Sequence, residues 1–260
     1  MPGKYKAAAI ECHYWKPGDD YIKATIEAIK SIVENGDFVT VSEKAVSTAR
    51  GNIVDEKTIK PGSLAGFIAK YWMRIVWPYF LGRACRMKRT TIQFLSVYPV
   101  EEGSRHKQVA LMHSGFLRAL MHGSEGAIDG SNLAYSYVAL PLENAEAVAQ
   151  ELRERIQQEL QKNVTVVVVD TDKTYSVRGF HFTPRPKPFK GIHSLGGVLA
   201  YVVGRSLGLK KRATPTAVSG RRISTEEAIE IAKLANRTRG SGAGKNVWDM
   251  VENFKVGWND

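Results

Sequence analysis

Two acidic segments of the chain have residue types that bind divalent cations together with phosphate. The first is Asp170-Thr171-Asp172, which directly follows the apolar run 164–169. A run that is apolar on both faces is typical of a strand inside a covered sheet, and such sheets bind ligands beyond the carboxyl ends of their strands. Carboxylate and hydroxyl oxygens suit magnesium or manganese. A turn in which Asp and Thr bond their own backbone explains this segment equally well.

The second acidic segment is Ile128-Asp129-Gly130-Ser131-Asn132, inside a glycine-bearing loop that runs over 122–132. Glycine permits a ligand to approach the backbone closely, and the Asp, Ser and Asn side chains could contact a metal and a sugar or phosphate. Taken by itself, the segment fits an ordinary Asx turn better than a binding site.

A third candidate is the glycine-rich stretch Gly240-Ser241-Gly242-Ala243-Gly244-Lys245. Consecutive backbone amides in such a loop could form an anion-binding nest, to which Lys245 adds positive charge. The stretch is not a Walker A loop, because Arg239 and Asn246 occupy the first and last positions of that motif and a helix precedes it instead of a strand. A connector near the end of the chain is the alternative interpretation.

A fourth candidate, 42–51, places hydroxyls and cations just past an expected strand. Its residues could bind phosphate or a base, although a solvated turn is equally plausible. The six histidines show no metal-ligand spacing. Neither H-E-x-x-H nor G-x-S-x-G occurs, which argues against a zinc hydrolase and the usual esterase triad.

The composition restricts the class of protein. The chain has 260 residues, a formal net charge of +11 and two cysteines, Cys12 and Cys85. The cysteine count and the lack of an apolar leader at the N-terminus predict a cytoplasmic protein. A positive surface attracts nucleic acid, anionic lipid or phosphorylated small molecules. Nucleic acid is the least favoured of these, because no aromatic-rich RNA motif or zinc-finger spacing occurs.

Hydrophobic periodicity and turn residues predict the elements that position these segments. The expected elements are helices over 20–36 and 144–160, strands over 38–42, 164–169 and 175–182, and a turn over 47–52. Two strands over 107–112 and 116–121, joined at Ser114-Gly115, are predicted as a hairpin. Asn144 is expected to cap one helix, and the S-x-x-E pattern of Ser224 and Glu227 predicts the start of another. A short tail helix is expected over 247–254.

The segment 64–85 is rich in aromatic residues. Lys70, Arg74 and Arg83 interrupt it, and Pro78 lies inside its longest apolar run. A membrane-spanning helix needs about 20 apolar residues, so no transmembrane segment is predicted. A buried helix with a basic edge is the first interpretation, and a surface that binds a membrane interface or a partner is the second.

Together these segments resemble the γ-glutamyl ligase family of coenzyme F-420 biosynthesis. The resemblance covers most of 10–55 and 107–220. It rests on the sequences K-P-G-D-D at 16–20, G-D-F-V-T-V-S-E-K-A-V-S at 36–47, G-A-I-D-G-S-N at 126–132 and V-V-V-V-D-T at 166–171. The third and fourth of these are the specific part.

The resemblance implies a two-lobed α+β fold with a mixed sheet and an intertwined homodimer. It implies a ligase-like domain over 1–222, with 56–106 as a divergent insertion, and a C-terminal part over 223–260 that completes the site. It further implies GTP as co-substrate, Mn²⁺ or Mg²⁺, and an amide bond formed between a phosphorylated small-molecule acid and glutamate.

Residue roles carried over by the resemblance are as follows. Asp129 and Asp170 are the implied catalytic metal ligands, together with Thr171. The implied nucleotide contacts are Ser42, Glu43, Ser47, Asn132, Thr171, Gly240, Ser241, Gly242 and Lys245, with 11–14 near the nucleotide. Two departures from the family pattern are Ser241 and Arg50, which stand where the family usually has a carboxylate. A nucleotide- or phosphometabolite-binding protein without catalysis, and a basic surface-binding protein, are therefore the alternative hypotheses.

Overall fold

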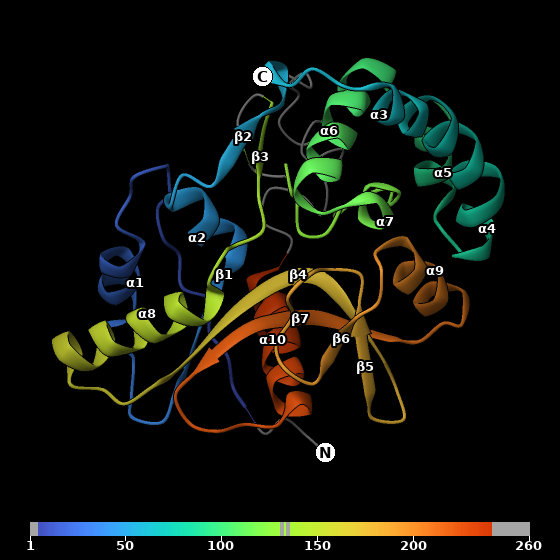
Figure 1. The fold of residues 1–260 in the computed structure, drawn as a ribbon. Helices are drawn as coiled ribbons and strands as arrows, with labels where there is room; N and C mark the ends of the chain where they lie inside the picture. The colour runs from blue at the N-terminus through green and yellow to red at the C-terminus, as the bar shows by residue number, and fades with distance from the viewer. Residues whose placement is uncertain (1–4, 131–132, 134–135, 241–260) are drawn as a thin grey trace.

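The central element of the computed structural model is one long strand. The structure describes residues 5–130, 133 and 136–240 (Figure 1). These residues form a five-stranded mixed sheet and a two-stranded sheet. The strands of the larger sheet are β1 (Phe38–Ser42), β4 (Thr165–Val177), β5 (Phe180–Thr183), β6 (Ile192–Ser194) and β7 (Lys210–Ser219). Strand β4 pairs in parallel with β1 and in antiparallel with β7 and β5.

Both faces of β4 are covered, as the apolar run 164–169 predicts. Val166 and Val168 pack in a core with α1 (Tyr21–Ile29) and α8 (Ala145–Leu160). Val167 and Val169, on the other face, pack in a core with α10 (Thr225–Arg239). Successive side chains of a strand point to opposite faces, so a strand between two helical layers must be apolar at every position. The strand does not end at Asp170 but continues to Val177, with an irregular register between Asp170 and Lys173.

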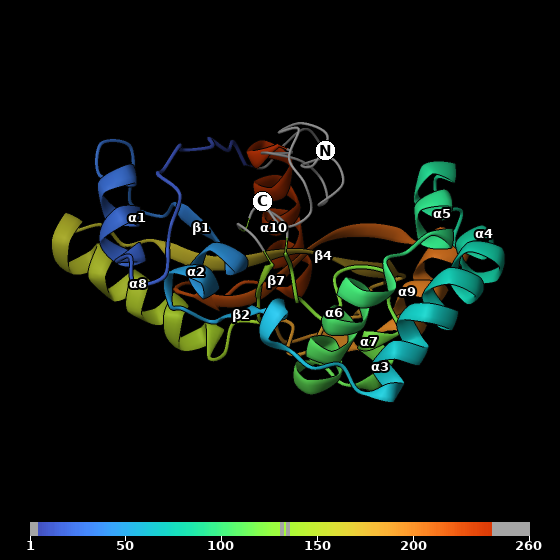
Figure 2. The same cartoon turned by 90° about the horizontal axis from the view of Figure 1, so that it is seen from above.

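A second lobe consists mainly of helices and lies at the opposite end from α1 and α8 (Figure 2). Its elements are β2 (Ile53–Asp55), η1 (Glu56–Thr58), α3 (Ser63–Phe67), η2 (Ile68–Leu81), α4 (Gly82–Ala84), α5 (Arg89–Ser96), α6 (Val100–His113), α7 (Phe116–Ala119) and β3 (Tyr137–Ala139). The helix α9 (Val198–Ser206) packs against α4 and α7. The predicted two-lobed α+β fold with a mixed sheet is confirmed.

The aromatic segment is helical, as predicted, but only one side of it is buried. Element η2 is a π-helix of 14 residues in which Trp77 is fully buried. The indole N–H groups of Trp72 and Trp77 both donate to the Leu120 carbonyl at 2.8 Å, which ties η2 to the residues after α7. No helix among the described residues is long and apolar enough to cross a membrane.

The hairpin predicted for 107–121 is wrong, because α6 and α7 occupy it. Ser114-Gly115 does form a turn, but it separates two helices, and Gly115 has φ +85°. The buried face of α6 includes Gly103, Lys107 and Ala110, which follow helical spacing. Because the buried face contains a lysine, its residues do not show the regular apolar spacing from which a helix is predicted.

Several local predictions are also corrected. Helix α1 ends at Ile29 and not at Gly36. The turn expected over 47–52 is mostly the helix α2 (Glu43–Ala49). The single strand expected over 175–182 is a hairpin that turns at Arg178 and Gly179, which have φ +45° and +82°. The capping box is confirmed, because the Ser224 hydroxyl accepts the Glu227 N–H at 3.2 Å. Asn144 starts α8, but its side chain makes no capping bond.

A buried chain of ionic contacts joins α6 to its neighbours. The His106 ring lies between two carboxylates, with Nδ1 2.6 Å from Glu56 and Nε2 3.2 Å from Glu125. The Lys107 ammonium donates to the other Glu125 oxygen and to the Met121 carbonyl. Burial alone would lower the pKa of His106, but Glu56 and Glu125 outweigh it and raise the pKa to about 10. His106 is therefore held as the cation that links two anions.

This chain of contacts predicts a pH-dependent stability. A pKa raised from 6.5 to about 10 gives a stabilisation that is complete below 6.5 and is lost as the pH rises through 10. Between those values the free energy of unfolding should fall with a slope of up to about 1.4 kcal/mol per pH unit. In His106→Gln this part of the slope should be absent. Guanidinium unfolding of both proteins at several pH values measures it.

The matched control is His113→Gln, at the exposed C-terminal end of the same helix. Its stability should follow the wild-type pH profile. Equal slopes for the wild type and His106→Gln would contradict the charged state assigned to His106.

Candidate functional site

The candidate site lies where β1 and β4 end side by side. The two strands are parallel, and Ser42 at the end of β1 pairs with Val169 of β4. The next residue on each strand is a carboxylate, Glu43 on one and Asp170 on the other. Glu43 is also the first residue of α2, and it is 3% exposed. The register of the sheet thus places two acids next to each other at a largely buried edge.

A buried arginine connects these two acids. Arg185 comes from the loop after β5 and is 2% exposed. Its Nη1 donates to Glu43 Oε2 at 2.6 Å and to Asp170 Oδ2 at 3.0 Å, and its Nη2 donates to Glu43 Oε1 at 2.8 Å. The Leu142 N–H donates to Glu43 Oε1 at 3.0 Å. The guanidinium fork fits a carboxylate with two parallel bonds, which fixes both side chains.

Asp129 reaches the same region from the other lobe. Its backbone forms an antiparallel bridge with Ala139, with N–H to carbonyl distances of 3.1 and 3.0 Å. Its Oδ2 lies 2.9 Å from the Lys44 ammonium, which belongs to α2. The negative charge of Asp129 also raises the pKa of both Asp170 and Asp172. The two aspartates singled out from sequence are 41 positions apart, and the charge of the first affects the titration of the second.

The site holds an excess of negative charge. Burial raises the pKa of Asp170 to about 6, with Glu43 and Asp129 acting in the same direction and Arg185 against them. Burial, and then the charge of Asp170, raises the pKa of Asp172 well above its ordinary value. The Asp172 Oδ2 atom is buried and has no hydrogen-bond partner within the described residues. A buried carboxylate oxygen without a partner is costly unless a cation or donor satisfies it.

These donors fit a divalent cation in chemical type, since oxygen ligands of this kind are what magnesium and manganese prefer. Across 5–130, 133 and 136–240, no three His, Cys, Asp or Glu side chains converge as a ready-made metal site. An ion held by Asp129 and Asp170 would take its other ligands from phosphate or water. Magnesium characteristically keeps such ligands.

The remaining residues proposed from sequence differ in burial and in hydrogen bonding, and some lie outside the described residues. The Ser47 hydroxyl is buried and donates to the Leu140 carbonyl at 2.8 Å. Ser42 is half-buried at the start of α2, and Thr171 is half-buried beside Asp170. Gly240 directly follows α10 with φ +74°. Asn132, Ser241, Gly242 and Lys245 lie outside the described residues.

Sequence inspection missed Arg185 as a site residue, and it included Lys44 only as one of the cations of the segment 42–51. Arg185 stands between Pro184 and Pro186 in a segment that reads as an extended basic loop. Glu43 could have indicated such a residue, because an acid that directly follows a buried strand is itself expected to be buried. A buried acid needs a positively charged partner, so the lysines and arginines of the neighbouring segments were candidates for it.

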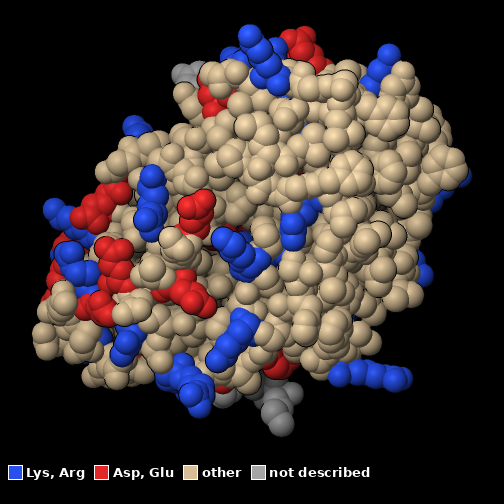
Figure 3. Space-filling view, in the orientation of Figure 1, with Lys and Arg blue, Asp and Glu red and all other residues tan. Residues whose placement is uncertain are grey.

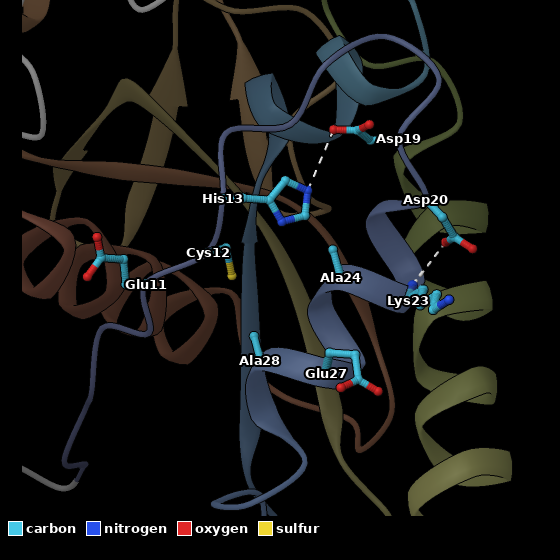
Figure 4. A pocket seen from close by; sticks show the side chains of 9 residues that line it. All are labelled: Glu11, Cys12, His13, Asp19, Asp20, Lys23, Ala24, Glu27 and Ala28. Atoms are coloured by element: carbon cyan, nitrogen blue, oxygen red, sulfur yellow. Dashed lines mark hydrogen bonds and ion pairs between the residues drawn. The ribbon is translucent and has the colours of Figure 1, made fainter.

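A groove of about 540 Å³ lies beside α1 (Figure 4). It is lined by Glu11, Cys12 and His13 on one side and by residues of α1 on the other. His13 Nε2 lies 3.6 Å from Asp19 Oδ2, and Asp20 caps α1 by accepting the Lys23 N–H at 2.9 Å. The segment 11–14, which the resemblance places near a nucleotide, thus borders an open polar groove.

The mixed sheet and the two lobes define an α+β protein, and acids gather at one edge of its larger sheet. The sequence model of the F420-0:gamma-glutamyl ligase family matches residues 9–246. The chain belongs to that family. It is also 36% identical over 263 residues to an uncharacterized protein of Methanocaldococcus jannaschii, in an alignment that covers 96% of this chain and 89% of the relative.

Replacing Arg185 by Met should destabilise the fold strongly. The substitution leaves Glu43 and Asp170 without their cation, and breaking a buried ion pair in this way costs roughly 3–5 kcal/mol. The matched control is Arg155→Met on α8, where the pair with Glu159 is exposed to solvent and contributes little to stability. Denaturant unfolding of both variants measures the difference. A loss in Arg185→Met no larger than in the control would contradict the structural role of Arg185.

Proposed function

We propose that this protein is a GTP- and divalent-metal-dependent ligase that forms an amide between a phosphorylated small-molecule acid and glutamate. Family membership supports a ligase-type function. The observation that carries the proposal is that Glu43 and Asp170 lie side by side at one edge of the sheet on buried Arg185, while Asp129 pairs with the neighbouring Lys44. Acids from two distant segments gathered at a strand end are what a phosphate-and-cation site requires.

The proposed reaction has two steps. A carboxylate oxygen of the acid attacks the γ-phosphorus of GTP, the bond from that phosphorus to the bridging oxygen breaks, and GDP leaves. The glutamate amine then attacks the acyl carbon, phosphate leaves and the nitrogen loses a proton. Both steps develop negative charge on oxygen, so a site that stabilises that charge accelerates them.

Residue roles in the proposal follow from this chemistry. Asp129 and Asp170, with Thr171, would hold Mn²⁺ or Mg²⁺, which supplies neutralising charge to the phosphates when bound. Arg185 and Glu43 orient Asp170 through the bonds described above. Lys44 does the same for Asp129. The glycine stretch 240–245 would supply backbone N–H donors to phosphate, as the sequence suggests.

We also propose that the ligase works as a homodimer in the cytosol. The family resemblance supports the dimer. The two cysteines support a reducing compartment, because Cys12 is exposed and Cys85 is buried and neither forms a disulfide. Light scattering of the purified chain tests the dimer, and a monomer at micromolar concentration would contradict it.

The ligase assay is direct. Purified protein is incubated with GTP, Mn²⁺, glutamate and each of a panel of candidate acids, and GDP and the amide are measured by chromatography. We expect GDP release only when all four components are present. ATP in place of GTP tests the nucleotide. Release of GDP that does not depend on the acid, or none with any acid, would contradict the proposal.

The metal ligands can be tested separately from the acid substrate. Asp129→Asn and Asp170→Asn should each lower turnover by about a hundredfold or more, because each removes a charge that positions the cation. The matched control is Glu159→Gln, an exposed acid on α8, which should retain wild-type turnover. Thermal unfolding of all variants separates lost activity from lost folding. Near wild-type turnover in a folded Asp170→Asn protein would contradict the assigned role.

A second candidate function is nucleotide or phosphometabolite binding without catalysis. The observation that favours it is the contact of Arg185 with Glu43 and Asp170, which supplies a permanent cation to the acids. Calorimetry with GDP distinguishes the two functions. A ligase should bind the nucleotide much more weakly without Mn²⁺ or with Asp170→Asn, whereas a metal-independent binder should be affected by neither change.

A further inference from the structure

The helical lobe exposes a continuous apolar stripe. Phe67, Tyr71, Ile75 and Tyr79 follow one another at intervals of four residues along the end of α3 and η2, and each is 43–57% exposed. Phe80, at 65% exposure, widens the stripe. The opposite side of η2 carries the buried residues of the lobe core. Side chains of this size on an exposed surface mark a binding face when they are contiguous.

The same region is free of acidic residues. From Lys57 to Val100 the chain has eight lysines and arginines and not one aspartate or glutamate. The exposed cations among them are Lys57, Lys60, Lys70, Arg83, Arg86, Lys88 and Arg89. In the rest of the described chain many surface cations pair with acids, as Lys30 does with Glu27 and Arg155 with Glu159. None of these seven has a salt-bridge partner among the described residues.

Helix α9 extends this apolar surface. It packs against α4 and α7, and its residues Leu199, Val203 and Leu207 are exposed at intervals of four. No acidic residue occurs in α9. Figure 3 shows a broad area without charge over the helical lobe and α9, with cations at its edge, whereas acidic side chains, interspersed with cations, lie on the side of α1 and α8. We call the α3–α5 and α9 side the basic-apolar face.

We propose that the basic-apolar face binds the surface of an anionic lipid bilayer. Exposed aromatic and aliphatic side chains can enter the boundary between headgroups and acyl chains, and unpaired cations at the edge meet anionic headgroups. The contact of the Lys70 ammonium with the Tyr71 ring, at 5.3 Å, places charge directly beside an apolar side chain. A positive charge beside an aromatic ring is favourable at the boundary between water and lipid, where the ring meets acyl chains and the charge meets headgroups.

The charge of the basic-apolar face favours an anionic bilayer over two other possible partners, a second copy of the chain and nucleic acid. A second copy of the same face would bring cations against cations with no acid to offset them. Nucleic acid would satisfy the cations and its bases could stack on the aromatic side chains, but it would leave the aliphatic side chains of Ile75, Leu199 and Val203 without an apolar partner. An anionic bilayer satisfies both the charge and the apolar area. Binding is peripheral, since none of the described helices is long and apolar enough to span a membrane.

The test is sedimentation of the full chain with vesicles of phosphatidylcholine alone or with about a third of phosphatidylglycerol. We expect binding only to the anionic vesicles, weakening as salt rises. Arg83→Gln/Lys88→Gln/Arg89→Gln should bind roughly a hundredfold more weakly, about fivefold for each cation. Tyr79→Ser/Phe80→Ser should lose binding even at low salt, because the apolar contribution is removed.

The matched control is Lys30→Gln/Arg155→Gln/Lys162→Gln, which removes the same charge from the turn after α1 and from α8 and its C-terminal end. It should bind the anionic vesicles like the wild type. Three results would overturn the proposal: no sedimentation with anionic vesicles at low salt, equal losses in the two triple variants, or a change of Tyr79→Ser/Phe80→Ser from dimer to monomer with vesicle binding intact. The last result would assign the face to a second copy.

Discussion

The contact of Arg185 with Glu43 and Asp170 is the interaction on which the site depends. It joins the end of β1, the middle of β4 and the loop after β5 in one buried set of bonds. Burying one charge is expensive, and burying several is possible only when each finds an opposite charge in good geometry. The parallel pairing of β1 with β4 meets that condition because it brings the two acids together, and the proline-flanked loop then supplies the cation.

The elements that were predicted correctly from the sequence are those whose signal lies within a single short segment. The valine run predicted a strand covered on both faces, and Ser224 with Glu227 predicted the start of α10, because each signal involves residues close in sequence. The prediction failed for α6, where Lys107 stands on the buried face and depends on Glu125 for its charge. That partner lies beyond α7, so no local pattern contains it.

The site shows the same division between local and long-range information. Asp129 and Asp170 could be chosen from sequence through the family resemblance, because each local segment alone fits a turn as well or better, and in the structure the charge of Asp129 raises the pKa of Asp170. Arg185 could not, because a cation in a basic loop looks like a solvated one until the buried acids are placed. The charge balance of a buried site depends on residues from several segments together, whereas a sequence pattern describes one segment.

The continuity of β4 has a consequence for movement. The strand passes without a break from the valine-rich core, through Asp170, to the hairpin with β5, and β7 follows it along nearly its whole length. Over 166–169 the strand is paired on both edges, with β1 and β7, so bending it there would break ladder bonds on both sides. Asp170 directly follows this doubly paired part and therefore has a fixed position relative to β1, whereas the loop that carries Asp129 and the proline loop that carries Arg185 lie outside the larger sheet.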